Sequence, residues 1–445
     1  MKVKKFSEID FVNEINKIKE KQFLSKVEQY ENYIAPQMRA IGYKKINQSE
    51  RTVVFSFGEI TFSRSRWTNG FQTRVPVDEW LGLEKYKRYS IEFLYHVAKL
   101  ATMMPYRQVC KVINSTLQTI ITKDCVLKAV KFVDKLLKEK ERYRIFMEEL
   151  PSRRKVKKLY VEGDGVLVKC TDASDERKYI DLTHFVIHTG SKKISAKRYE
   201  LQDKHEILKL NYEKAKDDLL DYIYNNYDID DDTILITNSD MGKGYTSRVF
   251  KEIGKALKIK KHEHFWDLYH VKEKLTTSLK KYPFELTELA LDAVKNYNFD
   301  QIELVFDTVE SLINNDSEYQ EFQKFKKKIL NNFKYTKPAH LRNLSNRGIG
   351  IMESQHRKIT YRMKRRGMYW SRWGISAMAN MIVLERANKL RDLFFGDWRE
   401  IYKEYKENSF SAGRIKRNLK EIPNCAKPLL NNNKNYYYGR VHIKY

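Results

Sequence analysis

The middle of the chain changes between strand and helix patterns, and this succession restricts the fold more than any other feature of the sequence. Residues 159–169 and 179–189 have the composition of β-strands, and residues 233–237 form a short, continuously apolar run. Helix patterns occupy residues 210–226 and 246–257. A short apolar run without polar alternation is typical of a parallel strand that is covered on both faces. We therefore expect an α/β domain here, in a chain that is α+β overall.

Other patterns surround this domain. A helical stretch and a β-hairpin signal around Gly58-Glu59 precede it, strand signals end near Trp266, and the end of the chain is basic without an amphipathic period. The expected segments are an N-terminal helical and hairpin region (1–88), a helix-turn-helix-like region (89–150), the first part of the α/β domain (151–260), an all-helical insertion (261–335), the second part of the domain (336–392) and a basic tail (393–445).

The region 89–150 contains short helix patterns with tight connections. Pro105 stands where a helix begins, and its missing N–H costs nothing in a first turn. Thr122 is a suitable N-cap for the next helix. A DNA-binding helix-turn-helix produces this pattern, and so does a packed three-helix bundle. The sequence favours DNA binding without excluding the bundle.

Composition narrows the class of protein. The chain has 85 Lys and Arg against 58 Asp and Glu, a net charge of +27, and 42% of its residues are apolar, as in ordinary globular proteins. It contains no apolar run of about 18 residues, and its first residues lack the apolar core of a signal peptide. Its four cysteines lie far apart, which argues against a disulfide scaffold or zinc ribbon. We expect a cytoplasmic protein that binds nucleic acid and no membrane.

Three carboxylates stand at positions that suit a metal site. Asp164 lies inside a predicted strand between Gly163 and Gly165, whose small size would let a phosphate backbone approach. Asp240 follows the apolar strand, at the end where open α/β sheets bind ligands. Glu353 begins a predicted helix. Carboxylates in this arrangement can hold two Mg²⁺ ions about 3.5–4 Å apart for phosphodiester chemistry.

Each carboxylate also has a structural interpretation. Asp240 is able to cap the turn that follows it. Glu353 is spaced to pair with Arg357 one helical turn later. Glu162 lies on the same strand face as Asp164 and competes with it as a ligand.

Three motifs at these positions resemble those of bacterial insertion-sequence transposases of the ISLre type, and the resemblance covers essentially the whole chain. The motifs are residues 160–166, 237–245 and 348–357. The resemblance implies a ribonuclease H-like catalytic domain with a helical insertion and two Mg²⁺ ions, for which Mn²⁺ would substitute. The Asp-Asp-Glu triad of the family falls on Asp164, Asp240 and Glu353.

The resemblance also implies an activity. Such a transposase binds the terminal inverted repeats of its element, cleaves DNA and transfers the freed 3′-hydroxyl to target DNA. Its partners would be double-stranded element ends and target DNA, held by a homodimer or a larger assembly. Two alternatives are a catalytically silent, transposase-derived DNA-binding protein and a ribonuclease H-like nuclease that cuts without joining.

The segment between the last two carboxylates carries a further motif. Asp267-x-x-His270 is similar to a motif of mutator-like transposases, and the 113 positions from Asp240 to Glu353 leave room for a helical insertion. Trp266 is predicted either to stack on an unpaired base or to anchor the core of the insertion. His270 is read either as a metal ligand or as the partner of a structural hydrogen bond.

A basic stretch follows Glu353 and contains no acidic residue up to residue 373. Interleaved aromatic residues and missing counter-charges favour contact with the DNA backbone over an ordinary solvated face. The predicted contacts are Arg357, Lys358, Arg362, Lys364, Arg365, Arg366 and Arg372.

Overall fold

The chain has a mixed α+β secondary structure. It forms two compact units, residues 1–134 with 149–390 and residues 135–148 with 391–445. The computed structural model describes residues 5–117, 119–147, 152–171, 179–196, 198–240, 242, 244–345, 347–364 and 367–407.

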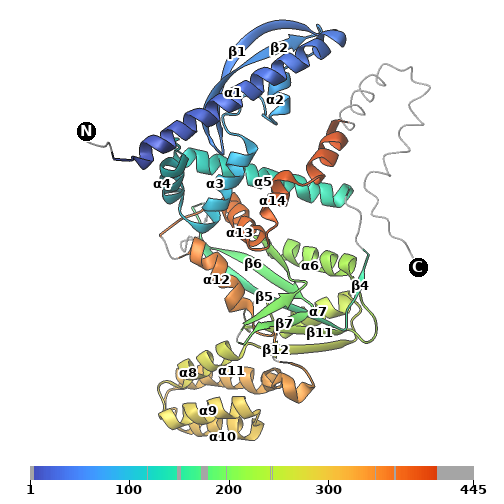
Figure 1. Ribbon diagram of the computed structural model, residues 1–445. Coiled ribbons are helices and arrows are strands. Elements are labelled where there is room, and N and C mark those ends of the chain that lie inside the picture. Colours follow the sequence, from blue (N-terminus) through green and yellow to red (C-terminus); the bar gives the residue numbers. More distant parts are fainter. Residues whose placement is uncertain are drawn as a thin grey trace, which may run out of the picture. The chain divides into compact units, whose positions relative to one another are not determined.

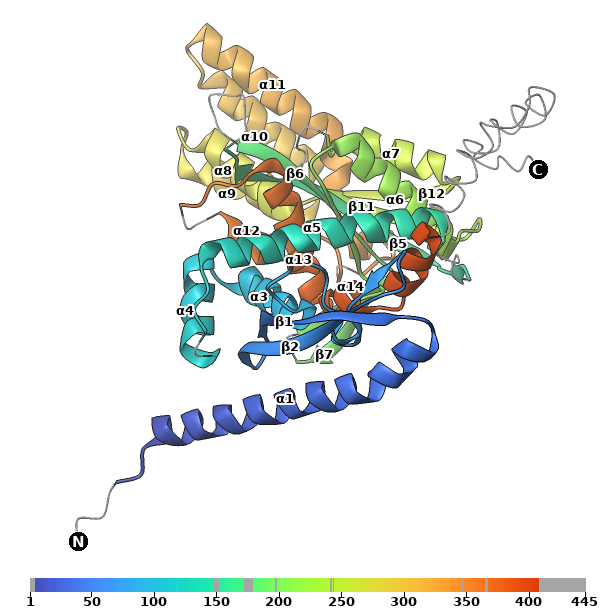
Figure 2. The same ribbon diagram turned by 90° about the horizontal axis from the view of Figure 1, so that it is seen from above.

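A β-hairpin covered by a long helix forms the N-terminal region. β1 (Lys44–Phe55) and β2 (Gly58–Thr68) pair antiparallel. Helix α1 (Glu8–Ala40) packs along β2 (Figure 2). Val27 of α1 and Phe62 of β2 share one apolar cluster, so burial of a single face joins helix and hairpin. Two short elements complete the region, β3 (Thr73–Arg74) and α2 (Pro76–Trp80).

Three helices follow where the sequence predicts a helix-turn-helix. They are α3 (Ile91–Met103), α4 (Tyr106–Leu117) and α5 (Lys123–Phe146). Ser90 caps α3 by accepting a hydrogen bond from its first turn. The buried side of α3 packs against α13 (Arg372–Arg386). The helices are therefore built into the core through α3, and DNA binding by the region 89–150 stays a prediction.

A five-stranded mixed sheet is the centre of the larger unit (Figure 1). Three neighbouring strands of the sheet pair antiparallel with one another. Two further strands lie beyond the first of these three and run parallel to it. From edge to edge the order is β12 (Lys261–Trp266), β11 (Ile234–Ser239), β5 (Lys158–Lys169), β6 (Tyr179–His188) and β9 (His205–Lys209).

Helices cover both faces of this sheet. α6 (Tyr212–Asn226) and α7 (Ser247–Ala256) lie on one face, where Leu159 of β5 shares a cluster with Phe250 of α7. α12 (Met352–Met363) packs on β5 from the other face. Because side chains alternate along a strand, odd-numbered residues from 159 to 165 face α6 and α7, and the even-numbered ones face α12.

A helical segment follows the last strand of the sheet and has its own apolar core (Figure 1). The predicted insertion boundary at residue 261 is wrong, because residues 261–266 form β12, and the helices begin at Leu268. The elements of the segment are α8 (Leu268–Leu279), α9 (Phe284–Asn296), α10 (Phe299–Ser311), α11 (Asp316–Asn332) and the 3-10 turns η1 (Phe333–Thr336) and η2 (Ala339–Arg342).

Strand β12 escapes sequence analysis because it carries two histidines on its core-facing side. The Thr237 hydroxyl on the neighbouring strand lies 2.9 Å from His262 Nε2 and 2.8 Å from His264 Nδ1, and Ser239 Oγ lies 3.3 Å from His264 Nε2. Hydrogen-bonded imidazoles are tolerated inside a sheet where isolated ones are costly. Burial lowers the pKa of His264 to about 3 and that of His262 to about 4, which keeps both rings neutral.

These histidines predict acid sensitivity. The folded-state pKa of His264 lies below its ordinary value of 6.5, so the stability that it contributes is present above pH 6.5 and is lost as the pH falls toward its folded-state pKa. At pH 5 the loss is about 2 kcal/mol. We expect His264→Gln to remove about that much of the difference between urea unfolding free energies at pH 7 and pH 5. His96→Gln, at an exposed site on α3, is the control. An unchanged pH dependence in His264→Gln would contradict the assignment.

The smaller unit combines the end of α5 with the helical residues after 390. Within it, Lys140 Nζ lies 2.5 Å from Asp392 Oδ2 and Lys406 Nζ lies 2.8 Å from Glu139 Oε1.

Of the predicted tail, residues 408–445 lie outside the described residues. None of the described helices is both long and apolar enough to cross a membrane. The remaining short elements are β4 (Arg154–Lys155), β7 (Gly190–Ser195), β8 (Arg198–Gln202), β10 (Tyr227–Asp228) and α14 (Leu390–Phe395).

Candidate active site around Asp164

Two of the predicted carboxylates come together on neighbouring strands. β5 and β11 are parallel neighbours in the sheet (Figure 1). Asp164 lies in β5, and Asp240 directly follows β11. Burial, and then the negative charge of Asp240, raise the pKa of Asp164 to about 7. A carboxylate whose ionisation is disfavoured by burial and by a neighbouring carboxylate is typical of a site that binds a cation or shares a proton.

Each of these aspartates uses one oxygen locally. Asp164 Oδ1 accepts a hydrogen bond of 2.7 Å from the Gly165 amide, and Asp240 Oδ1 accepts one of 2.7 Å from the Gly242 amide. A Cβ atom at position 242 would lie 2.7 Å from Asp240 Oδ1, so glycine permits this turn. The other Asp164 oxygen lies 3.4 Å from His356 Nδ1. Backbone amides thus orient both carboxylates, and His356 lies at the second oxygen of Asp164.

No contact joins Glu353 to this pair among the described residues. It is exposed in the first turn of α12. In the described part of the chain it makes no ion pair with Arg357, which was the structural interpretation of this residue. Among the described residues, no group of three or more His, Cys, Asp or Glu side chains is arranged to hold a metal ion. The structure therefore brings Asp164 and Asp240 together, and Glu353 as a third ligand stays a prediction.

The α12 side chain that reaches Asp164 is His356, which sequence analysis missed. It is buried, and its ring stacks on His184 of β6 with the ring centroids 5.2 Å apart. Burial lowers the pKa of His356 to about 3, so its ring is neutral. Its Nε2 atom is buried without a hydrogen-bond partner. The sequence did contain a signal for this residue, because His356 stands three positions after Glu353 and therefore on the same side of the predicted helix.

Two buried side chains hold the loop that leads into α12. The Glu162 carboxylate accepts hydrogen bonds from the amides of Gly350 (2.8 Å) and Ile351 (2.9 Å). The His188 ring lies 3.0 Å from the Gly348 carbonyl oxygen. Gly348 and Gly350 have φ values of +90° and +75°, which glycine adopts without strain. Glu162 is therefore occupied by backbone and does not compete with Asp164 as a ligand.

The glycines that flank Asp164 have a different role from the predicted one. They face the sheet side opposite to Asp164. A Cβ atom at Gly163 would lie 2.5 Å from the Phe185 ring, and one at Gly165 would lie 2.4 Å from Asp181 Oδ1. Their missing side chains make room for neighbours on β6. The expectation that they admit a phosphate backbone beside Asp164 is wrong.

The Asp267-x-x-His270 motif lies beside the same strand ends. Asp267 caps α8 by accepting a 2.8 Å hydrogen bond from the Tyr269 amide. The charge of His270 is among those that lower the pKa of Asp164, which places it near that carboxylate. His270 Nδ1 lies 3.3 Å from Glu273 Oε2. One helical turn further, Lys274 Nζ donates a 2.9 Å hydrogen bond to the Asp240 carbonyl oxygen. The first turns of α8 thus border the site.

Two of the cations predicted to bind DNA instead form contacts within the protein. Lys358 Nζ lies 2.5 Å from Glu206 Oε1, and Glu206 also lies 3.1 Å from the His184 ring. Arg362 is only 1% exposed and donates a 2.7 Å hydrogen bond to the Ala101 carbonyl oxygen. Both predictions are wrong, because the partners of these cations come from distant parts of the chain.

The base-stacking prediction for Trp266 is also wrong. Its side chain is 5% exposed and belongs to the apolar core of the helical segment. Of the remaining predicted DNA contacts, Arg357, Lys364 and Arg372 are exposed. Arg365 and Arg366 lie outside the described residues.

Comparisons with known proteins place the chain in a family. Residues 3–399 match the family described as "Uncharacterised protein family (UPF0236)". A Streptococcus gallolyticus protein, "UPF0236 protein in vanSb 3'region", is 29% identical over 380 residues, which cover 84% of this chain and 79% of that protein. A chain of the "Drosophila P element transposase strand transfer complex" aligns with 73% of this chain and 88% of its own at 10% identity, with a TM-score of 0.25, too low to show a common fold. The match over most of its length shows that the chain belongs to the UPF0236 family.

Proposed function

We propose that this protein is a DNA transposase with a ribonuclease H-like catalytic domain. The observation that carries the proposal is the pairing of Asp164 and Asp240 at neighbouring strands, where a backbone amide orients each carboxylate. The sheet supports it, since three antiparallel strands followed by two parallel ones are the arrangement of a ribonuclease H-like domain. The net charge of +27 suits a polyanionic substrate.

The donor set fits divalent metal ions. Asp164 and Asp240 offer hard carboxylate oxygens, which Mg²⁺ prefers, and a cation would relieve the repulsion that disfavours the ionised form of Asp164. We propose that Asp164 and Asp240 hold Mg²⁺, or Mn²⁺ in its place, with Glu353 completing the site from α12. Bound metal would lower the pKa of an attacking water or hydroxyl and stabilise the leaving oxygen.

The other residues near the site would orient the DNA and the carboxylates. Glu162 and His188 fix the loop before α12, so they would set the distance between Glu353 and the aspartates. His356 lies against Asp164 and would hold its carboxylate in place. The exposed side chains of Arg357, Lys364 and Arg372 would contact phosphates. In the joining step a 3′-hydroxyl forms a new P–O bond to target DNA while one target P–O bond breaks and leaves a new 3′-hydroxyl. Bringing two element ends together would require two subunits.

Joining of a pre-cut DNA end tests this function. Purified protein is mixed with a labelled element end that carries a free 3′-hydroxyl, a plasmid target and Mg²⁺, and joined products are resolved on a gel. We expect joining by the wild type and none by Asp164→Asn. Nicking without joining would instead indicate a nuclease. End binding without nicking or joining, in Mg²⁺ and in Mn²⁺, would indicate a catalytically silent DNA-binding protein.

A further inference from the structure

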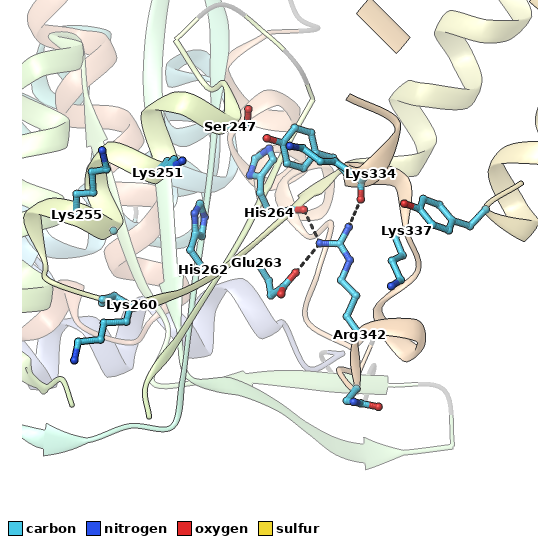
Figure 3. Close-up of a pocket in the computed structure, with 15 residues that line it drawn as sticks. Ser247, Lys251, Lys255, Lys260, His262, Glu263, His264, Lys334, Lys337 and Arg342 are labelled. Carbon is cyan, nitrogen blue, oxygen red and sulfur yellow. Dashed lines mark hydrogen bonds and ion pairs between the residues drawn. The ribbon is translucent and has the colours of Figure 1, made fainter. Parts of the chain in front are cut away.

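A basic pocket of about 820 Å³ lies at the outer edge of the main sheet (Figure 3). Its cations stand on two walls with β12 between them. Lys251 and Lys255 of α7 lie with Lys260 on one side of β12, and the η1–η2 segment is on the other. The cations of the second wall are Lys334, Lys337 and Arg342.

The positive charge of this pocket is largely uncompensated. Glu263 is the one acidic residue among the described pocket residues, and its carboxylate is 2.8 Å from Arg342 Nη1. Lys260 pairs with Asp231 outside the lining, at 2.6 Å. Within the described part of the chain, no ion pair is formed by the other four lysines, Lys251, Lys255, Lys334 and Lys337. Unpaired cations around a concave surface raise the local positive potential.

The second wall is fixed to the sheet edge. Besides its ion pair, Arg342 donates hydrogen bonds to the carbonyl oxygens of His264 (2.9 Å) and Lys334 (2.7 Å). Lys334 Nζ lies 5.3 Å from the centre of the Tyr335 ring, a cation–π distance. Lys337 Nζ lies 5.9 Å from the Tyr297 ring. These contacts hold the wall's cations in place before any ligand arrives, which lowers the entropic cost of binding.

The pocket is separate from the carboxylate site. His262 and His264 face α7, as Leu235 and Thr237 beside them do in the parallel register. Asp164 faces α12, on the opposite side of the sheet. A ligand in the pocket would therefore not touch the reacting phosphate.

We propose that this pocket is a second DNA-binding site, which holds the sugar–phosphate backbone of a duplex segment away from the reacting strand. Cations spread over two walls match a row of phosphates better than a single phosphate group, and each neutralised phosphate releases a counterion. The inference rests on the proposed function in taking DNA as the substrate. It assigns the pocket to the duplex that flanks or receives the cut.

Charge removal at the four unpaired lysines tests the site. Lys251, Lys255, Lys334 and Lys337 are replaced together by Gln in the full chain, and binding of a fluorescent duplex of about 30 base pairs is followed by anisotropy in EDTA over a range of salt concentrations. We expect the slope of log affinity against log salt to become shallower by about 3–4 and affinity near physiological salt to fall about 10²-fold. Replacement of the same four residues by Arg is expected to keep the wild-type slope.

A matched control distinguishes the loss of charge in the pocket from a general loss of positive charge on the protein. It replaces four exposed lysines of the helical segment by Gln, namely Lys280, Lys295, Lys324 and Lys327. Equal losses in both variants would overturn the proposal, and so would a wild-type slope in the pocket variant. A slope that falls in the pocket variant and in the Arg variant alike would indicate altered folding and would also overturn it.

Competition by free nucleotide tests whether the pocket binds the phosphates of a nucleotide instead of those of the DNA backbone. We expect millimolar dATP to compete weakly and equally for the wild type and the pocket variant. Strong dATP competition confined to the wild type, with no change in duplex slope, would assign the pocket to nucleotides instead. Because all of these measurements omit metal, a failure of strand joining would refute the proposed transposase activity and leave the binding result standing.

Discussion

Replacing Asp164 by asparagine is expected to abolish strand joining, by about 10³-fold or more, while making the metal-free protein more stable. The activity falls because a carboxylate oxygen of the proposed metal site is lost. The stability rises because burial and the charge of Asp240 both disfavour the ionised carboxylate, whose pKa they raise to about 7. Such opposite effects on stability and activity are typical of functional sites.

The sign of the stability effect depends on pH. Between about pH 4 and pH 7 the folded protein holds a proton on Asp164 that the unfolded chain releases, so wild-type stability falls as the pH rises. Asparagine removes this dependence. In EDTA we expect the advantage of Asp164→Asn in the free energy of urea unfolding to increase by about 2–3 kcal/mol from pH 5 to pH 8.

Added Mg²⁺ is expected to reverse that order. It should stabilise the wild type by binding the folded state and should barely affect Asp164→Asn. Asp203→Asn, which removes an exposed carboxylate paired with Arg154, is the matched control and should respond to Mg²⁺ like the wild type. A loss of stability in Asp164→Asn at pH 8 in EDTA would contradict the account, as would an unchanged response to Mg²⁺.

Glu162→Ala is expected to destabilise the fold by about 2–4 kcal/mol and to lower strand joining by about 10²-fold. The Glu162 side chain is buried and accepts hydrogen bonds from the Gly350 and Ile351 amides. Its removal takes the acceptors of the Gly350 and Ile351 N–H groups away and frees the loop that positions Glu353 and His356.

Two further variants sharpen this prediction. Glu162→Gln keeps one acceptor oxygen but turns an amide NH₂ toward the second N–H group, so its effects should be intermediate. Glu59→Ala removes a surface ion pair with Arg88 and should cost less than about 1 kcal/mol without affecting joining. Urea unfolding and the joining assay provide both readouts. Wild-type joining by Glu162→Ala would show that the loop does not position the site.

The order of strands and helices around Asp164 was predictable because those strands are locally apolar. β11 begins with the apolar residues Ile234–Ile236, which were predicted as a strand. β12 was not predictable, since Lys, His and Glu alternate along it and its histidines are satisfied by Thr237 from another strand. Local periodicity contains no information about such partners.

In the candidate site too, local sequence predicted some features, whereas others depend on partners that are distant in the chain. Asp164 and Asp240 were identified from their places at strands, and the structure puts them on neighbouring strands. Lys358 and Arg362 were assigned to DNA because no acid stands near them in sequence. Their partners, Glu206 and the Ala101 carbonyl, lie 152 and 261 positions away. A charged helix face is therefore correctly read only when the packing against it is known.

Mn²⁺ binding, measured by electron paramagnetic resonance of the free ion, tests the central claim most directly. The account predicts that the wild type binds Mn²⁺ without DNA and that Asp164→Asn and Asp240→Asn each weaken this binding about 10²-fold. Asp203→Asn should bind as the wild type does. Equal Mn²⁺ affinity in the wild type and both active-site variants would contradict the assignment of Asp164 and Asp240 as the metal-binding pair.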